Sequence, residues 1–210
     1  MTPEPPRPFP QISRVTMPAD TLLHRIHDRS REPTSFNPCQ GRPTRFAPLW
    51  RIDGSCIATA YAAQSLECAV HETIFHEIGH SAAIKVIDTD AIESLDHSTI
   101  ALSRDLILCG LFEPDLNRWR LTRRDLIDTF PTSYATTASW AIAAHDMHPD
   151  IDGLIWTSRR CDPMLACVLF GDRLGNGSLH TRSRDPIDQS PALLSQMRDF
   201  AGRAGITLIC

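Results

Sequence analysis

Residues 71–80 carry two glutamates that could each take part in catalysis. The segment reads HETIFHEIGH, and its second half fits the H-E-x-x-H motif. In that motif, two histidines one helical turn apart bind zinc and the glutamate between them acts as general base. His76, Glu77 and His80 would fill these roles in a zinc-dependent hydrolase. The other carboxylate, Glu72, lies one helical turn before His76.

The zinc motif works only when both histidines lie on one face of a continuous helix. Gly79 falls between them, at a position where a helix is expected to end, and the following SAAIKV segment is typical of a strand. A third ligand would have to come from Glu93 or His97, and neither belongs to a known extension of the motif. We therefore expect no bound metal and keep the zinc-dependent hydrolase as an alternative.

Several polar residues elsewhere occupy positions where a hydrophobic core would not need them. Arg25 lies inside the apolar segment LLHRIH, and Arg45 begins RFAPLW at the end of a long polar loop. Tyr61 ends one strand-like segment, and Ser158 ends another, GLIWTS. Each residue alone is just as typical of a solvated face, a strand end or a turn. Their combination with Glu72 indicates a functional site.

Three stretches together resemble a known family. They are LHRIH followed by FNPCQGRPTRFAPL, then ATAYAAQSLECAVHETIFHE, and finally SYATTASWAIAAH followed by DGLIWTSRRCDPMLACVLFGDR. In this order they resemble the RES-domain family, which is named for its arginine, glutamate and serine and comprises toxins of bacterial toxin–antitoxin pairs. The resemblance covers residues 22 to about 174. The SRR triplet departs from it, because Arg160 stands where relatives often have an uncharged polar residue.

The resemblance implies a toxin of a type II toxin–antitoxin pair that degrades NAD. Such an enzyme cleaves the nicotinamide–ribose bond, by hydrolysis or phosphorolysis, and arrests growth; the alternative within the family is transfer of ADP-ribose to a protein. The implied catalytic residues are Arg25, Glu72 and Ser158. The implied NAD-binding residues are Arg25, His27, Arg45, Phe46, Tyr61, Glu72 and Ser158.

These assignments agree with the chemistry of the side chains. Arginine binds phosphate through two parallel, permanently charged hydrogen bonds, which suits Arg25 and Arg45 to a diphosphate. The ring of Tyr61 could stack on the cationic nicotinamide. Cleavage builds positive charge on the ribose, and a fixed carboxylate such as Glu72 stabilises that charge. Ser158 could hold the ribose or orient the incoming nucleophile.

The resemblance also implies a partner. It predicts an Xre-type helix-turn-helix antitoxin that blocks the active site, in a dimer or larger complex. We expect no direct binding to nucleic acid, because the net charge is −4 and a basic face is therefore not favoured. A protein that holds NAD without turning it over is a third functional hypothesis.

The segments that carry these residues have recognisable patterns. Strands are predicted from apolar runs at 22–27, 55–61, 82–88, 105–112, 153–158, 164–170 and 206–209. Helices are predicted from 66 to about 78 after the N-cap Ser65, at 123–128 after Thr122, at 134–147, and after Ser190-Pro191. Residues 29–48 are predicted to form a long loop.

The mixture of short strands and helices without regular alternation predicts an α+β fold. The resemblance specifies it as an ADP-ribosyltransferase-like split sheet, mixed or antiparallel, flanked by helices in one domain. We expect a proline-rich extended arm at 1–18 and a catalytic domain at 19–210. The seven scattered cysteines lack C-x-x-C spacing, so we expect reduced thiols and a cytoplasmic location. No segment is typical of a secretory signal or a membrane span.

Overall fold

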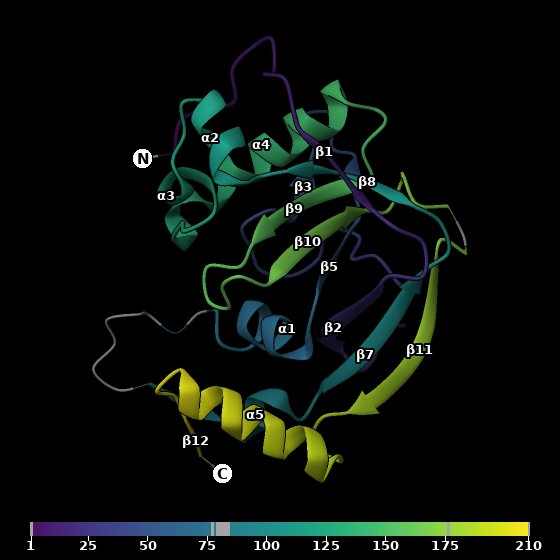
Figure 1. Ribbon diagram of the computed structural model, residues 1–210, viewed down its shortest axis with the longest axis vertical. Coiled ribbons are helices and arrows are strands. Elements are labelled where there is room, and N and C mark those ends of the chain that lie inside the picture. The colour runs from purple at the N-terminus through teal and green to yellow at the C-terminus, as the bar shows by residue number, and fades with distance from the viewer. Residues whose placement is uncertain (1, 77, 79–84, 176, 210) are drawn as a thin grey trace.

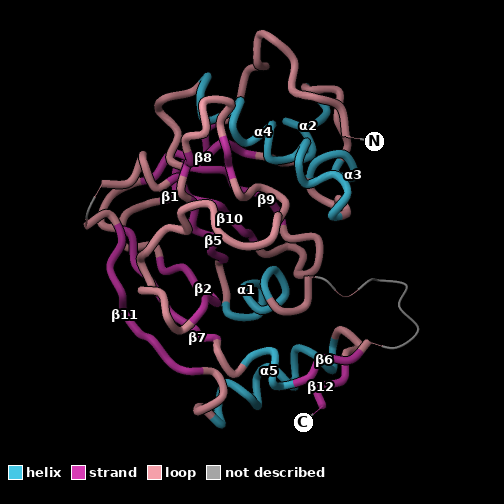
Figure 2. Tube along the Cα trace, turned by 180° about the vertical axis from the view of Figure 1, so that it is seen from behind, coloured by secondary structure: helices cyan, strands magenta, loops and turns pink. Residues whose placement is uncertain are grey.

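The computed structural model describes residues 2–76, 78, 85–175 and 177–209 (Figures 1 and 2). Its centre is an eight-stranded sheet in the order β1-β8-β9-β10-β5-β2-β7-β11. The strands are β1 (Arg14–Met17), β2 (Leu22–Asp28), β5 (Thr59–Ala63), β7 (Leu95–Leu102), β8 (Leu106–Gly110), β9 (Gly153–Thr157), β10 (Leu165–Phe170) and β11 (Leu179–Pro186).

The sheet is mixed and curls into a half-barrel (Figure 1). Neighbouring strands are antiparallel except β8 and β9, which run parallel. The pairing of β2 with β5 consists of the single register pair His24 and Ala63, so the sheet is split at that point. The predicted α+β class with a split mixed sheet is therefore confirmed.

Helices and two small sheets cover the main sheet. The α-helices of the described residues are α1 (Leu66–Thr73), α2 (Glu113–Arg118), α3 (Arg123–Leu126), α4 (Tyr134–Met147) and α5 (Pro191–Arg203). One small sheet pairs β3 (Leu49–Trp50) with β4 (Cys56–Ile57), and the other pairs β6 (Val86–Asp88) with β12 (Thr207–Ile209). Single-turn 3₁₀ helices lie at Thr89–Ile92 and Pro131–Ser133. In Figure 1, α2, α3 and α4 gather at one end of the molecule, and α1 and α5 lie toward the other.

The predicted helix caps are confirmed where the sequence carried a clear signal. The Ser65 hydroxyl accepts from the Cys68 amide at 3.2 Å and begins α1, and the Ser190 hydroxyl accepts from the Leu193 amide at 3.4 Å and begins α5. Thr122 forms a capping box with Asp125 at the start of α3. These side chains satisfy amides that have no partner within the first turn.

Several element boundaries differ from the prediction. Helix α1 ends at Thr73 rather than near residue 78, because the chain turns inward to bury Phe75 completely. The predicted strand at 55–61 is divided into β4 and β5 around Ala58, whose carbonyl accepts from the Gly171 amide. In the predicted strand at 82–88, β6 comprises Val86–Asp88, and residues 82–84 lie outside the described part of the chain.

The elements without a prediction were β1, β3, β7, β11, α2 and the two 3₁₀ helices. The expected arm is extended, but residues 14–17 form β1 beside β8 and Ile12 is buried, so the segment is packed on the domain. The segment packs in this way because the apolar side chains of Phe9 and Ile12, which lie among the prolines, contact the hydrophobic core.

The expectation of reduced thiols is wrong for two cysteines. Cys39 and Cys56 form a disulfide that joins the 29–48 loop to β4. Among the described residues, Cys68, Cys109, Cys161 and Cys167 are free. No helix within the described ranges is long and apolar enough to cross a membrane. The cytoplasmic location stays a prediction.

Candidate active site

Glu72 lies at the end of α1, where its carboxylate is held from two sides. The Ser158 hydroxyl donates to Oε1 at 2.6 Å, and Nη1 of Arg45 donates to Oε2 at 3.2 Å. The Glu72 side chain is 11% exposed and that of Arg45 is 6% exposed. Both oxygens therefore point in fixed directions within a mostly dry environment, which strengthens their electrostatic effect on anything placed beside them.

Ser158 is fully buried in the turn that follows β9. Its hydroxyl oxygen accepts from the amides of Arg160, at 3.2 Å, and Cys161, at 3.1 Å. A serine hydroxyl has one proton to donate, and here that proton is directed at Glu72. The turn thus fixes the serine, and the serine fixes the carboxylate.

The loop that carries Arg45 is anchored by Tyr61. The Tyr61 hydroxyl accepts from the Phe46 amide at 2.8 Å and shares a hydrogen bond with the Thr44 hydroxyl at 3.0 Å. Burial raises the pKa of Tyr61 to about 12, so the group stays a neutral phenol near neutral pH. Through these two hydrogen bonds, the Tyr61 hydroxyl holds the loop in place.

Phe46 and Trp156 form the floor under Arg45. The Arg45 guanidinium lies 5.6 Å from the centroid of the Trp156 ring, a cation–π contact that helps to hold it toward Glu72. Phe46 is fully buried and meets Trp156 edge-on at 5.1 Å. The side chain of Phe46 therefore belongs to the hydrophobic core, and a role for Phe46 in binding NAD stays a prediction. Trp156 had not been singled out from the sequence.

Arg25 and His27 lie on the other face of the sheet from Glu72. Alternate residues of a strand point to opposite faces. Leu23 packs in one hydrophobic cluster, whereas Ile26 packs in the other together with residues of α1. Arg25 and His27 share the face of Leu23.

The contacts of Arg25 are those of a structural residue. Its Nη1 donates to the carbonyls of Pro33 and, at 3.0 Å, Ser35, and burial lowers its pKa to about 10. His27 is held by Ser98 at 2.8 Å, and burial lowers its pKa. No contact among the described residues joins Arg25 to Glu72, so the structure does not bring the expected catalytic arginine to the carboxylate.

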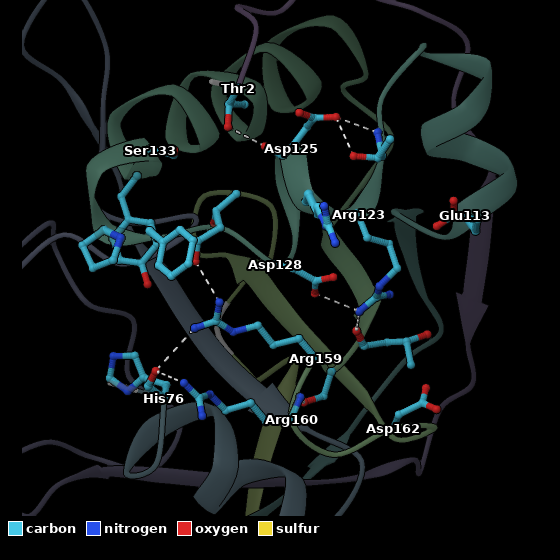
Figure 3. Close-up of a pocket in the computed structure, with 18 of the residues that line it drawn as sticks. Thr2, His76, Glu113, Arg123, Asp125, Asp128, Ser133, Arg159, Arg160 and Asp162 are labelled. Atoms are coloured by element: carbon cyan, nitrogen blue, oxygen red, sulfur yellow. Dashed lines mark hydrogen bonds and ion pairs between the residues drawn. The ribbon is translucent and has the colours of Figure 1, made fainter. Parts of the chain in front are cut away.

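A pocket of about 1970 Å³ opens beside Ser158 (Figure 3). Arg159 and Arg160 line it next to the serine, and Arg123 and Arg124 line it from α3. Burial lowers the pKa values of Arg159 and Arg160, and the neighbouring positive charges lower them further. The pocket wall next to Ser158 therefore offers two arginines to an anionic ligand, whereas acidic residues line other parts of the pocket: Glu113, Asp125, Asp128 and Asp162.

Arg159 and Arg160 also hold the segments around Glu72 together. Arg159 donates to the Thr129 carbonyl at 2.8 Å, and Arg160 donates to the His76 carbonyl at 2.8 Å. Their Nε atoms are buried without a partner among the described residues. The sequence marks Arg160 as a departure from the family pattern, and the two consecutive arginines after Ser158 are the signal that indicates this part of the pocket.

Of the three residues of the zinc alternative, the structure describes only His76, which does not lie on a helix as the motif requires. Helix α1 ends at Thr73, so His76 follows the helix, and its Nδ1 lies 2.7 Å from the Thr73 carbonyl. Glu77 and His80 lie outside the described residues. Within the part of the chain that the structure describes, no three His, Cys, Asp or Glu residues are grouped as metal ligands.

Comparisons with known proteins address the family and the fold. The model of the RES domain matches residues 22–189. The fold is similar to one in the crystal structure of the M.tuberculosis MbcT-MbcA toxin-antitoxin complex, with a TM-score of 0.62 and 18% identity over 88% of this chain and 92% of the other. No curated protein sequence matches the chain. Because the family match extends from the first residue of β2 to the residue before the cap of α5, this protein belongs to the RES domain family.

Proposed function

We propose that this protein is the toxin of a type II toxin–antitoxin pair and that it consumes NAD by cleaving the nicotinamide–ribose bond. The observation that carries the proposal is the Glu72 carboxylate, fixed by Ser158 and Arg45 beside a large pocket lined with arginines. Membership of the RES domain family and the likeness to a structure of a toxin–antitoxin complex support the biological role.

The chemistry follows from the position of Glu72. Loss of nicotinamide leaves an oxocarbenium-like ribose, and a carboxylate that is already oriented stabilises that state more than the neutral sugar. Ser158 and Arg45 prevent Glu72 from rotating away. Guanidinium nitrogens of Arg25, Arg159 and Arg160 all donate to backbone carbonyls, but Arg159 and Arg160 line the pocket and Arg25 does not. We therefore assign the diphosphate to this arginine pair.

The acceptor of the ADP-ribose is water or phosphate in this proposal, with transfer to a protein side chain as the second candidate. The proposal includes an Xre-type antitoxin that covers the pocket, because an uninhibited enzyme of this kind would exhaust the NAD of its own cell.

The test is release of nicotinamide from NAD by the purified chain, with and without phosphate. Glu72→Gln is expected to abolish release, because the amide cannot offset the developing positive charge. Glu67→Gln is the matched control: Glu67 lies on the same helix and pairs with Arg203 near the surface at 2.6 Å, away from the pocket. Release that requires phosphate would identify phosphorolysis.

The same variants test the biological role. Expression of the unmodified chain and of Glu67→Gln should arrest growth, whereas Glu72→Gln should not. If purified protein left NAD intact while Glu72→Gln still arrested growth, the proposed function would be refuted. ADP-ribose attached to cellular protein, without release of free ADP-ribose, would establish the transferase instead.

A further inference from the structure

The N-terminal strap, which we define as residues 2–13, precedes the matched RES domain and lies across the helices at one end of the molecule (Figures 1 and 2). Two tryptophans bind its backbone: Nε1 of Trp140 donates to the Pro3 carbonyl at 2.7 Å, and Nε1 of Trp119 donates to the Gln11 carbonyl at 2.9 Å. The strap is therefore hydrogen-bonded at both of its ends.

Phe9 fixes the middle of the strap. Its ring meets the rings of Trp119 and Trp140 edge-on, each at 5.6 Å, and lies 5.8 Å from His148. Trp119 and Trp140 stack on each other at 5.6 Å. Trp119 ends α2 and Trp140 lies in α4, so one phenylalanine of the strap joins two helices. Edge-on aromatic contacts of this kind are favourable beyond the area they bury.

The start of the strap reaches the pocket. The Thr2 hydroxyl donates to the Asp125 carbonyl in α3 at 2.6 Å, and both residues line the pocket. In Figure 3 they lie at the opposite end of the pocket from His76 and Arg160. Helix α3 has four residues, too few for a stable helix in isolation, so its position depends on such contacts.

Helix α3 brings both signs of charge to the pocket, because Arg123 and Arg124 line it together with Asp125, whose carboxylate accepts from the amide and hydroxyl of Thr122. Glu113 of α2 lines the pocket as well. Arg123 is partly occupied, because it pairs with Asp128 at 3.3 Å and donates to the Thr157 carbonyl at 3.0 Å. Arg124 and Arg42 line the pocket, are exposed, and form no ion pair with any described residue. The volume of about 1970 Å³ exceeds the roughly 300–1,000 Å³ of common ligand sites, so the pocket has room for a dinucleotide.

We propose that the N-terminal strap is a positioning element that holds α2 and α3 as the far wall of the pocket, and that this wall binds the adenosine-monophosphate half of the substrate. The inference rests on the proposed function for the identity of the substrate. The reacting half lies at Glu72 and Ser158, which the strap does not contact. The strap therefore affects the affinity for the whole dinucleotide, whereas the rate of bond cleavage depends on Glu72.

The experiment compares two substrates that share the reacting bond: NAD, and nicotinamide mononucleotide, which lacks the adenosine half. The variants are Phe9→Ala and Phe9→Leu in the full chain, with Glu4→Ala as the matched control at an exposed strap residue. For Phe9→Ala, the KM for NAD is expected to rise about tenfold with kcat within about twofold, because ground-state and transition-state binding are lost equally. The KM for nicotinamide mononucleotide should not change, and Phe9→Leu should restore most of the affinity for NAD.

Binding of ADP-ribose, measured by calorimetry, separates this inference from the proposed function. If the chain releases no nicotinamide but binds ADP-ribose, and Phe9→Ala weakens that binding about tenfold, the function is wrong and the role of the strap stands. Absence of ADP-ribose binding by the unmodified chain overturns the inference. Equal losses for both substrates, or a KM for NAD that Phe9→Ala leaves unchanged, overturn it as well.

Discussion

Replacement of Ser158 by alanine tests the geometry on which the site depends. The Ser158 hydroxyl donates to Glu72 at 2.6 Å and accepts from the amides of Arg160 and Cys161 at 3.2 and 3.1 Å. The side chain is fully buried, so water does not replace these contacts readily. Alanine at this position would remove all three interactions at once.

The expected loss of stability in Ser158→Ala follows from the number and type of these hydrogen bonds. A hydrogen bond to a charged group contributes about 1.5–3 kcal/mol, and a buried amide left without an acceptor costs about 1–3 kcal/mol. With partial relaxation of the turn, we expect Ser158→Ala to lower the free energy of unfolding by about 2–5 kcal/mol. For a chain of this length that corresponds to a fall in Tm of roughly 5–15 °C. Typical domains have about 5–15 kcal/mol of stability, so most of the variant should remain folded for assay.

The assay is urea and thermal unfolding of the unmodified chain, Ser158→Ala, and the control Ser139→Ala. The Ser139 hydroxyl donates to the Ala135 carbonyl on the surface of α4, so its loss should change stability by less than about 0.5 kcal/mol. A double-mutant cycle with Glu72→Ala should give a coupling of about 1–3 kcal/mol between Ser158 and Glu72. Additive effects, together with an unchanged Tm for Ser158→Ala, would refute the hydrogen bond between Ser158 and Glu72.

Three further perturbations have defined outcomes. Tyr61→Phe removes the acceptor of the Phe46 amide, so we expect a loss of about 1–3 kcal/mol in urea unfolding; unchanged stability would contradict the anchoring role. Burial, and then a neighbouring histidine, lower the pKa of His97 from 6.5 to about 4, so the unfolded chain binds this proton at pH values where the folded chain does not. Stability should therefore be full above pH 6.5 and fall by about 2–3 kcal/mol toward pH 4, a dependence that His97→Gln should reduce. Cys39→Ser removes the disulfide to Cys56, which spans a sequence separation of 17, and should lower the free energy of unfolding by about 3 kcal/mol. The Tm of this variant should not respond to reductant. If the Tm of the unmodified chain does not respond to reductant either, the disulfide is contradicted.

The sequence alone was sufficient to predict the helices and strands that have a clear pattern of apolar residues within their own segment. The apolar runs at 153–158 and 164–170 became the buried strands β9 and β10, and the helix predicted at 134–147 has those bounds as α4. Such segments carry their own periodicity and turn residues. By contrast, β11 is mostly exposed and pairs only with β7 among the described strands, so no apolar alternation marks it. Strand β1 follows a proline-rich segment and is stabilised by its pairing with β8.

The motifs in the sequence were likewise sufficient to identify the family and to select Glu72 and Ser158, which the fold brings within 2.6 Å of each other. Their meeting depends on a tertiary arrangement in which α1 lies beside the end of β9, and no spacing in the sequence encodes it. The same is true of Arg45, which approaches Glu72 because Tyr61 and Trp156 hold its loop.

Tertiary structure alone decided the side of the sheet on which Arg25 lies. The residue type suited a phosphate site, but strand alternation turns its guanidinium toward the carbonyls of the 29–48 loop. Tertiary structure also decided that the N-terminal strap packs on α2 and α4 through Phe9, and that Cys39 and Cys56 meet. The physical reason is common to all three: each contact joins segments whose own sequences are compatible with several environments, and only the packing of the whole chain selects one.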